Sequence, residues 1–455
     1  MHYISTRGQT EAMGFKQAVM TGLAPDGGLL IPETIPSVST QKLKAWESKS
    51  FIELAKEILS LYIDDIPPVQ LKQLVDEAYA AFDIPEVIAM TSVEELQVLE
   101  LFHGPTLAFK DIALQFLGRL FQHILEVEKG HLNILAATSG DTGSAAIAGV
   151  SGLSNIDIFV MYPKGKISNL QELQMTAAPA ENVHCLAVQG SFDDCQNIMK
   201  SLFGDIGFKE RYHLGAVNSV NWARILAQIV YYAFASLKFN GSNPPSFVIP
   251  TGNFGNIFAG IIAKKMGFPI DKLILATNEN DILARFFNSG RYSRGQVHYT
   301  LSPAMDIQVA SNFERFLYYA MGSDSERLCR FMENFAKEGT ATMDSYETGT
   351  ILATSITNNE TRTAMRAVYK NNGYVADPHT AVGLSAAGRF SVIGQKICLS
   401  TAHPAKFPET VDSVLGENLV SHERLNKLKG LESRSITVNA DQDLIAKYIV
   451  DNCRA

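Results

Sequence analysis

The hydrophobic pattern changes character along the chain. Over residues 51–62 and 69–82, apolar positions recur at helical spacing, and Asp83-Ile-Pro85 then breaks the pattern. From about residue 95 onward, short apolar runs of strand length alternate with helical stretches. The runs that we predict to be strands cover residues 132–138, 156–162, 183–188, 246–250, 273–277 and 396–400. Such alternation is typical of βαβ units, so we expect an α/β fold with mostly parallel sheets covered on both faces.

The first 90 residues differ in pattern from the remainder. They contain a Gly- and Pro-rich segment at residues 22–28 and the two helical patterns. We therefore predict a separate N-terminal domain over residues 1–90, although the Gly-rich segment could equally be a simple loop. Residues 91–455 would form the main unit. In it, residues 241–245 (Gly-Ser-Asn-Pro-Pro) are either the exposed crossing between subdomains or a simple turn.

The composition is that of an ordinary globular enzyme. The 455 residues are 46% hydrophobic and 19% charged, which allows two or three domains with a large buried core. The formal net charge of −8 presents no basic face, so we expect no nucleic-acid partner.

Cysteine use and the apolar runs favour a reducing compartment away from membranes. The five cysteines are scattered and form no CxxC pair. The N-terminus lacks the charged-then-apolar pattern of a signal peptide, and apolar runs such as 229–237 fall short of the roughly 20 residues of a membrane helix. We therefore expect a cytoplasmic protein with no membrane association.

Two Gly-rich turns lie between a predicted strand and a predicted helix. Residues 251–256 (Thr-Gly-Asn-Phe-Gly-Asn) follow the strand at 246–250 and precede a helix at 257–265. Backbone N–H groups at such a turn, together with the helix N-terminus, favour a phosphate dianion. Residues 139–143 (Ser-Gly-Asp-Thr-Gly) have the same placement after the strand at 132–138, and they suit a second anion such as a substrate carboxylate. Either turn alone could be only a tight turn.

Lys110 lies where a turn opens into a helix. Residues 104–106 (Gly-Pro-Thr) supply the turn, and apolar residues then fall on one helical face. The helix dipole disfavours the ammonium form, which would make Lys110 a competent Schiff-base nucleophile. The alternative is a surface lysine beside Asp111. One such amine together with two anion-binding turns is what a phosphorylated aldehyde requires, and this favours pyridoxal 5'-phosphate.

Other candidate groups are fewer. For a substrate phosphate, the strongest basic candidate is Arg224, supported by Asn221 and by Lys164 or Lys166; the alternative for Arg224 is a surface ion pair. The ten histidines show no metal-ligand spacing, so we expect no catalytic metal. His103 and His403 lie near the relevant segments, and each could be a purely structural hydrogen-bonding group.

The motifs of this chain carry a family resemblance. They include Phe-His-Gly-Pro-Thr-Leu-Ala-Phe-Lys-Asp at residues 102–111, Ala-Thr-Ser-Gly-Asp-Thr-Gly at 137–143 and Thr-Ala-His-Pro-Ala-Lys-Phe at 401–407. Further matches lie at residues 3–8, 22–28, 162–168, 190–196, 218–224, 250–256 and 377–381. Nearly end to end, the chain resembles the long-form threonine synthases of bacteria and fungi, which are pyridoxal-phosphate enzymes of fold type II, the tryptophan-synthase-β group.

The resemblance implies both a fold and a reaction. It implies two α/β subdomains, the smaller at roughly residues 100–225, within a catalytic domain at 91–455 that follows the N-terminal domain at 1–90. The reaction would convert O-phospho-L-homoserine and water to L-threonine and phosphate, through a Schiff base of the cofactor on Lys110. We expect a monomer or weak homo-oligomer that binds this small-molecule substrate.

The resemblance also implies roles for individual residues. The cofactor phosphate would be held by Gly252, Asn253, Phe254, Gly255 and Asn256. Thr401 would meet the pyridine nitrogen. The substrate carboxylate would be received at Ser139, Gly140, Asp141, Thr142 and Gly143. Relatives elsewhere in the fold group usually have Asn where Asp141 stands, contacting the ring hydroxyl of the cofactor, so the role and charge of Asp141 stay open.

Two other functions compete with this interpretation. One is another fold type II enzyme, such as a dehydratase or β-replacement synthase, which would lack a pocket for the substrate phosphate. The other is a non-catalytic homologue that binds a metabolite or a partner. An intact Lys110 together with both Gly-rich turns argues against the second.

Overall fold

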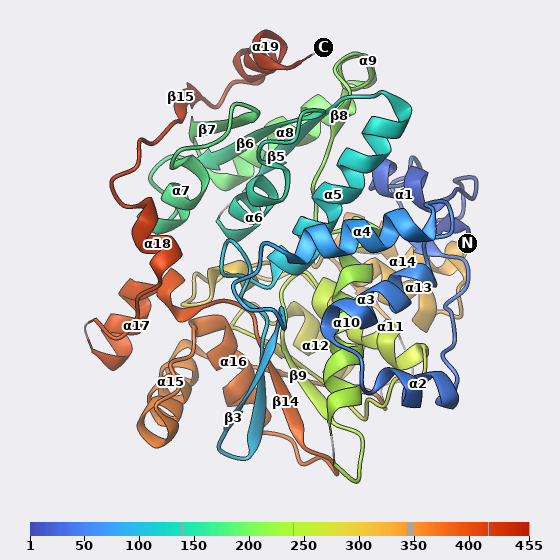
Figure 1. Cartoon of the computed structure of the whole chain (residues 1–455), viewed down its shortest axis with the longest axis vertical. Coiled ribbons are helices and arrows are strands. Elements are labelled where there is room, and N and C mark those ends of the chain that lie inside the picture. Colours follow the sequence, from blue (N-terminus) through green and yellow to red (C-terminus); the bar gives the residue numbers. More distant parts are fainter. Residues whose placement is uncertain (139, 240, 344–348, 417, 455) are drawn as a thin grey trace.

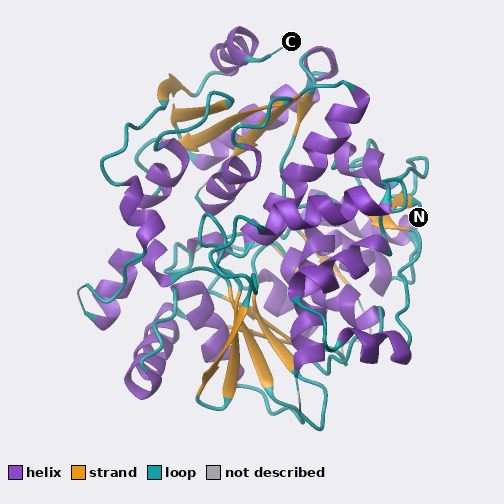
Figure 2. Ribbon diagram, in the orientation of Figure 1, coloured by secondary structure: helices purple, strands orange, loops and turns teal. Residues whose placement is uncertain are grey.

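Two largely parallel sheets dominate the molecule, and Figures 1 and 2 show them as an upper and a lower layer of strands. The computed structural model describes the whole chain except residues 139, 240, 344–348, 417 and 455. Within the described residues, the larger sheet has six strands in the order β13-β10-β9-β14-β4-β3, and the smaller has five in the order β15-β7-β6-β5-β8. The predicted α/β fold with mostly parallel sheets is confirmed.

The larger sheet is parallel except at one edge, where β3 runs antiparallel to β4. Its strands, in sheet order, are β13 (Ile351–Ser355), β10 (Leu273–Thr277), β9 (Ser246–Pro250), β14 (Lys396–Ser400), β4 (Leu96–Glu100) and β3 (Ala89–Val93). Every residue of β9 and β10 is buried, as expected for central strands that are covered by helices on both faces.

The smaller sheet is parallel throughout. Its strands, in sheet order, are β15 (Ile436–Asn439), β7 (Val183–Gln189), β6 (Ile156–Pro163), β5 (Leu132–Ala137) and β8 (Leu214–Gly215). The chain returns to this sheet after β14, so β15 lies outside the range 100–225 expected for the smaller subdomain. Two short antiparallel ribbons pair β1 (Tyr3–Ser5) with β2 (Leu30–Pro32) and β11 (Arg291–Ser293) with β12 (Thr340–Thr342).

The helices of the N-terminal segment pack against the catalytic core. They are α1 (Phe15–Thr21), α2 (Thr40–Trp46), α3 (Phe51–Ser60) and α4 (Pro68–Tyr79). A capping box of Ser50 and Glu53 starts α3, and a proline at the first helical position starts α4. The apolar faces of α1, α3 and α4 meet α5 (Lys110–Glu128) and α10 (Trp222–Lys238), and Trp46 of α2 stacks on Phe268. All of them belong to one continuous hydrophobic core.

The remaining helices cover the two sheets and connect them (Figure 1). They are α6 (Asp141–Val150), α7 (Asn169–Thr176), α8 (Phe192–Gly204), α9 (Ile206–Arg211), α11 (Gly255–Lys265), α12 (Ile282–Ser289), α13 (Phe313–Ala320), α14 (Ser325–Glu338), α15 (Asn358–Asn372), α16 (Pro378–Ala387), α17 (Pro408–Leu415), α18 (Glu423–Leu428) and α19 (Gln442–Asn452), with 3₁₀ turns η1 (Pro303–Met305) and η2 (Pro404–Lys406). Among the described residues, no helix combines the length and the apolar character that crossing a bilayer requires.

Two glycines let α5 and α6 pack backbone against backbone. A Cβ atom on Gly118 would lie 1.9 Å from the carbonyl oxygen of Gly149, and one on Gly149 would lie 2.5 Å from that of Leu114. Each glycine lies about two turns after the start of its helix. Because the helices approach so closely, their first residues, Lys110 and Asp141, come to lie beside each other.

Candidate active site

Three adjacent strands of the larger sheet deliver the predicted site residues to one edge. In the order β9-β14-β4, their carboxyl ends lead to residues 251–256, to Thr401 and to the segment that carries Lys110. From the smaller sheet, β5 leads to Asp141 at the start of α6. Ligands of parallel α/β sheets bind beyond the carboxyl ends of the strands. Lys110, Asp141, Thr401 and residues 251–256 all follow such ends.

The backbone before Lys110 is fixed to the segment that follows β14. The N–H of Phe109 donates to the carbonyl of Thr401 at 2.8 Å, and the N–H of His403 donates to that of Leu107 at 3.0 Å. Leu107 has φ +61, a left-handed conformation that costs energy for a residue with a Cβ atom. These contacts set where α5 begins, and so they place Lys110.

The Lys110 amine lies in an enclosed and electrostatically mixed environment. Its side chain is 13% exposed, and its Nζ lies 4.0 Å from Oδ2 of Asp141. Burial lowers the pKa of the Lys110 ammonium to about 8; Asp141 opposes this change, whereas the cationic Arg224 and Lys406 reinforce it. An amine with this pKa is partly neutral near physiological pH, as a nucleophile or a proton carrier must be.

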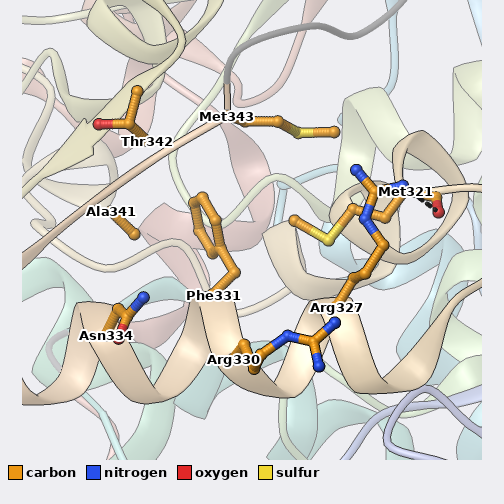
Figure 3. Close-up of a pocket in the computed structure, with 8 residues that line it drawn as sticks. All are labelled: Met321, Arg327, Arg330, Phe331, Asn334, Ala341, Thr342 and Met343. Atoms are coloured by element: carbon orange, nitrogen blue, oxygen red, sulfur yellow. Dashed lines mark hydrogen bonds between the residues drawn. The ribbon is translucent and has the colours of Figure 1, made fainter.

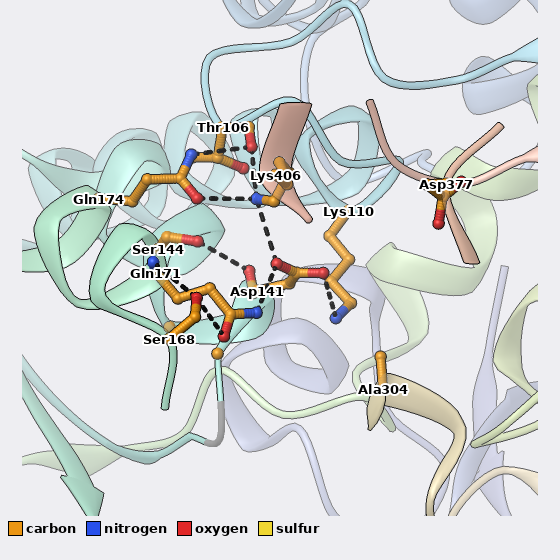
Figure 4. Close-up of polar contacts among 12 residues, drawn as sticks. Thr106, Lys110, Asp141, Ser144, Ser168, Gln171, Gln174, Ala304, Asp377 and Lys406 are labelled. Atoms are coloured by element: carbon orange, nitrogen blue, oxygen red, sulfur yellow. Dashed lines mark hydrogen bonds and ion pairs between the residues drawn. The ribbon is translucent and has the colours of Figure 1, made fainter. Parts of the chain in front are cut away.

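Asp141 is held from several sides (Figure 4). Its Oδ1 accepts from Nε2 of Gln171 at 3.3 Å and lies 3.1 Å from Nζ of Lys406. Burial by itself raises the pKa of Asp141, but the ammonium groups of Lys406 and Lys110 overcome it and hold the pKa well below its usual range. These two neighbouring ammonium groups favour the ionised form of the Asp141 carboxyl, whose charge the sequence left open.

Lys406 is the main site residue to which sequence reasoning gave no role. It lies at the end of η2 and is 1% exposed. Its only sequence signal is a position within the 401–407 motif, because nothing in the local pattern shows that its side chain reaches Asp141.

Residues 252–256 form an open cradle of backbone donors. No acceptor for the five N–H groups of this loop lies among the described residues. Phe254 adopts φ +65 and turns the chain into α11, so the N–H groups gather at a helix start. A Cβ atom on Gly252 would lie 3.0 Å from the carbonyl oxygen of Ala304, which accounts for glycine there. The loop fits a phosphate dianion.

Groups outside this loop hold it in place. Asn312 donates both its backbone N–H (3.0 Å) and its side-chain Nδ2 (3.2 Å) to the carbonyl of Asn253. The hydroxyls of Tyr231 and Tyr232 donate to Oδ1 of Asn256 at 2.6 and 2.8 Å. Nδ2 of Asn256 is buried and has no partner within the described part of the chain. A buried donor of this kind indicates a ligand acceptor nearby.

Arg224 is a buried cation near the start of α10. Its side chain is in a residue only 4% exposed, and within the described ranges its Nε and Nη1 have no hydrogen-bond partner. Burial lowers the pKa of Arg224 to about 10. Because the residue is buried and the described residues supply no carboxylate partner, the alternative of a surface ion pair is wrong. An unpaired buried guanidinium is costly unless an anion completes the site.

In the second Gly-rich turn, the side chain of the preceding residue, Thr138, occupies two of the backbone N–H groups. Oγ1 of Thr138 accepts from the N–H groups of Gly140 and Gly143, each at 3.0 Å. Gly140 has φ +149, and a Cβ atom there would lie 2.5 Å from Nε2 of Gln171. Neither N–H is free for a substrate carboxylate in this arrangement, whereas the N–H groups of Asp141 and Thr142 have no acceptor among the described residues. Ser139, also predicted here, lies outside the described residues.

Two other predicted substrate-binding residues have structural partners. Asn221 caps α10, with Oδ1 accepting from the N–H of Ala223 at 3.1 Å and Nδ2 donating to the carbonyl of Val19 at 2.8 Å. Lys164 is exposed, and its Nζ donates to Oγ1 of Thr437 at 3.0 Å. Asn221 therefore fixes the start of α10, the helix that carries Arg224. No described contact joins Lys164 to the site.

Thr401 and the two histidines named in the sequence differ in whether they have hydrogen-bond partners within the described residues. Thr401 is 7% exposed, and its hydroxyl makes no hydrogen bond to the described residues, so it could meet a ligand. His403 accepts from the N–H of Ala405 at 3.1 Å, and burial lowers its pKa to about 4, so the imidazole is neutral. His103 pairs with Glu100 at 3.1 Å. Both histidines have structural hydrogen-bond partners.

A cavity of about 380 Å³ lies away from this edge, between α14 and the segment around β12 (Figure 3). Met321, Arg327, Phe331 and Met343 are among its lining residues, and no predicted site residue is. Within the described residues, no cluster of His, Cys, Asp and Glu is arranged to bind a metal ion.

Three family models match consecutive parts of the chain. The first, described as the threonine synthase N terminus, matches residues 2–79. The second, described as a pyridoxal-phosphate dependent enzyme, matches residues 91–396, and the third, described as the threonine synthase C-terminal region, matches residues 380–449.

Similar proteins include curated relatives and solved structures. The threonine synthase of Schizosaccharomyces pombe is 46% identical over 457 residues, covering 91% of this chain and 89% of that protein. That of Saccharomyces cerevisiae is 43% identical, with 98% and 97% covered. The crystal structure of PLP-bound threonine synthase from Brucella melitensis superposes with a TM-score of 0.97 at 40% identity over 100% of both chains. Threonine synthase from yeast gives 0.93 at 42% identity, covering 99% and 98%.

Proposed function

Because this chain belongs to the threonine synthase family, we propose that Lys110, the 252–256 loop and Arg224 carry out the reaction of that family. The chain is a pyridoxal-phosphate-dependent lyase with threonine synthase function. It converts O-phospho-L-homoserine and water to L-threonine and phosphate.

The residues at the edge of the larger sheet fit the cofactor. Lys110 would hold the cofactor carbonyl covalently, and Thr401 would meet the pyridine nitrogen. The cofactor phosphate would be held by the N–H groups of residues 252–256 and by Nδ2 of Asn256, which have no acceptor within the part of the chain that the structure describes. Asp141 would face the ring edge. When bound, pyridoxal phosphate supplies an electron sink for negative charge that develops on the substrate.

Lys110 is the proton carrier in this proposal. With a pKa of about 8, its amine can be neutral when it takes a proton from the substrate and can then return that proton as an ammonium. A single amine beside the bound substrate would be able to serve successive proton transfers. The enclosed position of the side chain limits competing exchange with water.

The substrate phosphate would bind at Arg224. The observation that supports this assignment is the burial of its guanidinium group, for which the described residues supply no hydrogen-bond partner at Nε and Nη1. A buried guanidinium with two unpartnered nitrogen atoms requires an anion, and a planar fork of donors suits a phosphate. Arg224 acts electrostatically on Lys110, so the two groups serve one site. Asn221, as the cap of α10, would hold the start of the helix that carries Arg224. Lys164 would contribute less to substrate binding, because its described partner is Thr437.

The substrate carboxylate would bind at the turn that includes Gly140, Thr142 and Gly143. No acceptor for the N–H of Thr142 lies among the described residues, whereas the N–H of Gly140 donates to the hydroxyl of Thr138. The N–H of Gly143 donates both to that hydroxyl and to the carbonyl of Gly140. The carboxylate of Asp141 disfavours a second anion directly against it, so the substrate carboxylate would lie on the Thr142 side of the turn.

We propose the domain division from the same findings. An N-terminal domain at residues 1–90 and a catalytic domain at 91–455 agree with family models that match 2–79 and 91–396. The smaller subdomain at roughly 100–225 is joined by β15. We further propose a cytoplasmic location, a monomer or weak homo-oligomer, and no nucleic-acid partner, in keeping with the acidic net charge.

The assay is the formation of threonine and inorganic phosphate from O-phosphohomoserine. Both products should appear in equal amounts and only with the cofactor present. A dehydratase of the same fold would release ammonia from serine or threonine instead, and a non-catalytic homologue would release neither phosphate nor ammonia.

Arg224→Met tests the role of the arginine. We expect the KM for O-phosphohomoserine to rise roughly 100-fold, because a charged bond to the substrate phosphate is lost, while the Kd of the cofactor changes little. Removal of a buried unpaired charge should also raise the Tm of the ligand-free protein. An equal loss of affinity for substrate and cofactor would assign Arg224 to structure alone.

A further inference from the structure

A second buried lysine faces the candidate active site. Lys406 has a side chain with no exposed surface, and its ammonium group has three partners (Figure 4). Its Nζ donates to the carbonyl oxygen of Thr106 at 2.6 Å and to Oε1 of Gln174 at 2.9 Å, and it lies 3.1 Å from Oδ1 of Asp141. Two of these partners are neutral, so Asp141 is the direct counter-ion of this buried charge.

Asp141 lies between two ammonium groups. Oδ1 faces Lys406 at 3.1 Å, while Oδ2 faces Lys110 at 4.0 Å. The other polar group against it is Gln171, and His379 acts on it from a greater distance. A buried carboxylate that keeps its charge needs such compensation, because desolvation of a single ion costs several kcal/mol.

Other charged groups also act on Lys110. Arg224 and Lys406 oppose its charge, while Asp111 and Asp141 favour it. Asp111 is turned away and accepts from the N–H and hydroxyl of Thr106 at 2.8 and 2.7 Å. Asp141 is thus the carboxylate that faces the amine, and Lys406 is the ammonium group paired directly with that carboxylate.

We propose that Lys406 is a positioning residue for the reaction, because its ammonium group fixes Asp141 as a carboxylate whose second oxygen points at the nitrogen of residue 110. This proposal rests on the proposed function of Lys110. Lys406 contacts neither the reacting atoms nor the amine; it acts through Asp141. The pair sets how readily the nitrogen of residue 110 keeps its proton.

The test is a pH titration of the absorbance of the cofactor-loaded protein, which reports the protonation of that nitrogen without turnover. Lys406→Met removes a positive charge and leaves the carboxylate, so the midpoint should rise by about one pH unit or more. Asp141→Asn removes the negative charge, so the midpoint should fall. Lys396→Met is the matched control, because Lys396 lies at the opposite end of β14 and donates to the carbonyl of Ala387; it should leave the midpoint unchanged.

The double variant Lys406→Met with Asp141→Asn separates charge balance from simple packing. Removal of both charges eliminates the uncompensated carboxylate, so the midpoint should return toward that of the parent protein. If Lys406→Met folds but does not load the cofactor, the double variant should recover loading. Tm values of the ligand-free proteins confirm folding.

Two results would overturn the proposal. One is a loaded Lys406→Met protein with the midpoint of the parent, and the other is a double variant that is as impaired as Lys406→Met, which would make Lys406 a structural tether of Thr106 and Gln174. Failure of the proposed function looks different: the parent protein would have no cofactor absorbance, or Lys110→Ala would retain it.

Discussion

The two Gly-rich turns look alike in sequence and differ in what they offer a ligand. Residues 252–256 leave five successive N–H groups without acceptors in the described structure, and residues outside the loop hold it in place. In the turn at 140–143, the hydroxyl of Thr138 takes two of the N–H groups, and the charged side chain of Asp141 projects from the same turn. The first turn is an open anion cradle, and the second is a closed turn that presents a carboxylate.

This difference shows that a glycine spacing predicts where a turn lies but not whether its donors are free. In residues 252–256 the backbone donors are left without described acceptors, because side chains from outside the loop hold its conformation. These are Asn312, Tyr231 and Tyr232. Backbone donors are consumed where a neighbouring hydroxyl can reach them. Lys110 lies beside Asp141 of the second turn. In the proposed function it both holds the cofactor and carries protons, so its loss should affect the reaction most.

Lys110→Ala should have the largest effect. Both the covalent hold on the cofactor and the proton carrier are lost, so kcat/KM should fall by roughly 10³-fold or more. Absorbance spectra and product assays check this, with Lys396→Met as a control lysine. Turnover that survives in Lys110→Ala would show that neither turn is organised around this amine.

Gly252→Ala should weaken the open cradle selectively. The new Cβ atom would lie 3.0 Å from the carbonyl oxygen of Ala304 and beside the phosphate site, so the cofactor Kd should rise about tenfold, or about 1.4 kcal/mol. Equilibrium titration of the ligand-free protein with cofactor measures it. Gly143→Ala, in the other turn, should affect mainly the KM of the substrate. A comparable rise of the cofactor Kd in Gly143→Ala would contradict the distinction between the two turns.

Thr138→Val should destabilise the closed turn. The N–H of Gly140 would lose its acceptor, whereas that of Gly143 would keep the carbonyl of Gly140 at 3.1 Å. An unsatisfied buried donor costs about 1–3 kcal/mol. The Tm should fall by a few degrees while the cofactor Kd changes little. The exposed Thr363, which donates to a carbonyl within α15, supplies the matched Thr→Val control. An unchanged Tm would mean that the turn does not depend on this hydroxyl.

The pH dependence of cofactor uptake gives the smallest and finest test. Because burial lowers the pKa of the Lys110 ammonium to about 8, the rate of uptake by the ligand-free protein should rise with pH around a midpoint of about 8 and level off at higher pH. Asp141→Asn should move this midpoint downward, because the carboxylate favours the ammonium form. A midpoint near the ordinary lysine value of about 10.4 would contradict the burial of the amine.

The central strands of both sheets could be predicted because they are continuous apolar runs. β9, β10 and β14 match the predicted bounds at both ends, and β5, β6 and β7 match within one residue. β13 and β15 were missed because threonine, serine and asparagine interrupt their short runs. Such strands are specified by the neighbour they pair with, which local pattern does not show.

The site was predicted in part for a similar reason. Lys110 and residues 252–256 lie at element boundaries that the sequence marks. The role of Lys406 depends on a contact with Asp141, which is distant in sequence, and the closure by Thr138 depends on the direction of one hydroxyl. The burial of Arg224 did have a signal, because α10 is apolar on nearly all sides and therefore has to lie in the core.

The most direct test of the central claim is to reduce the cofactor-loaded protein with borohydride and map the modified peptide by mass spectrometry. The account predicts one cofactor attached to Lys110 in the peptide that contains residues 102–111. Attachment at another lysine, Lys406 included, or no attachment at all, would contradict it.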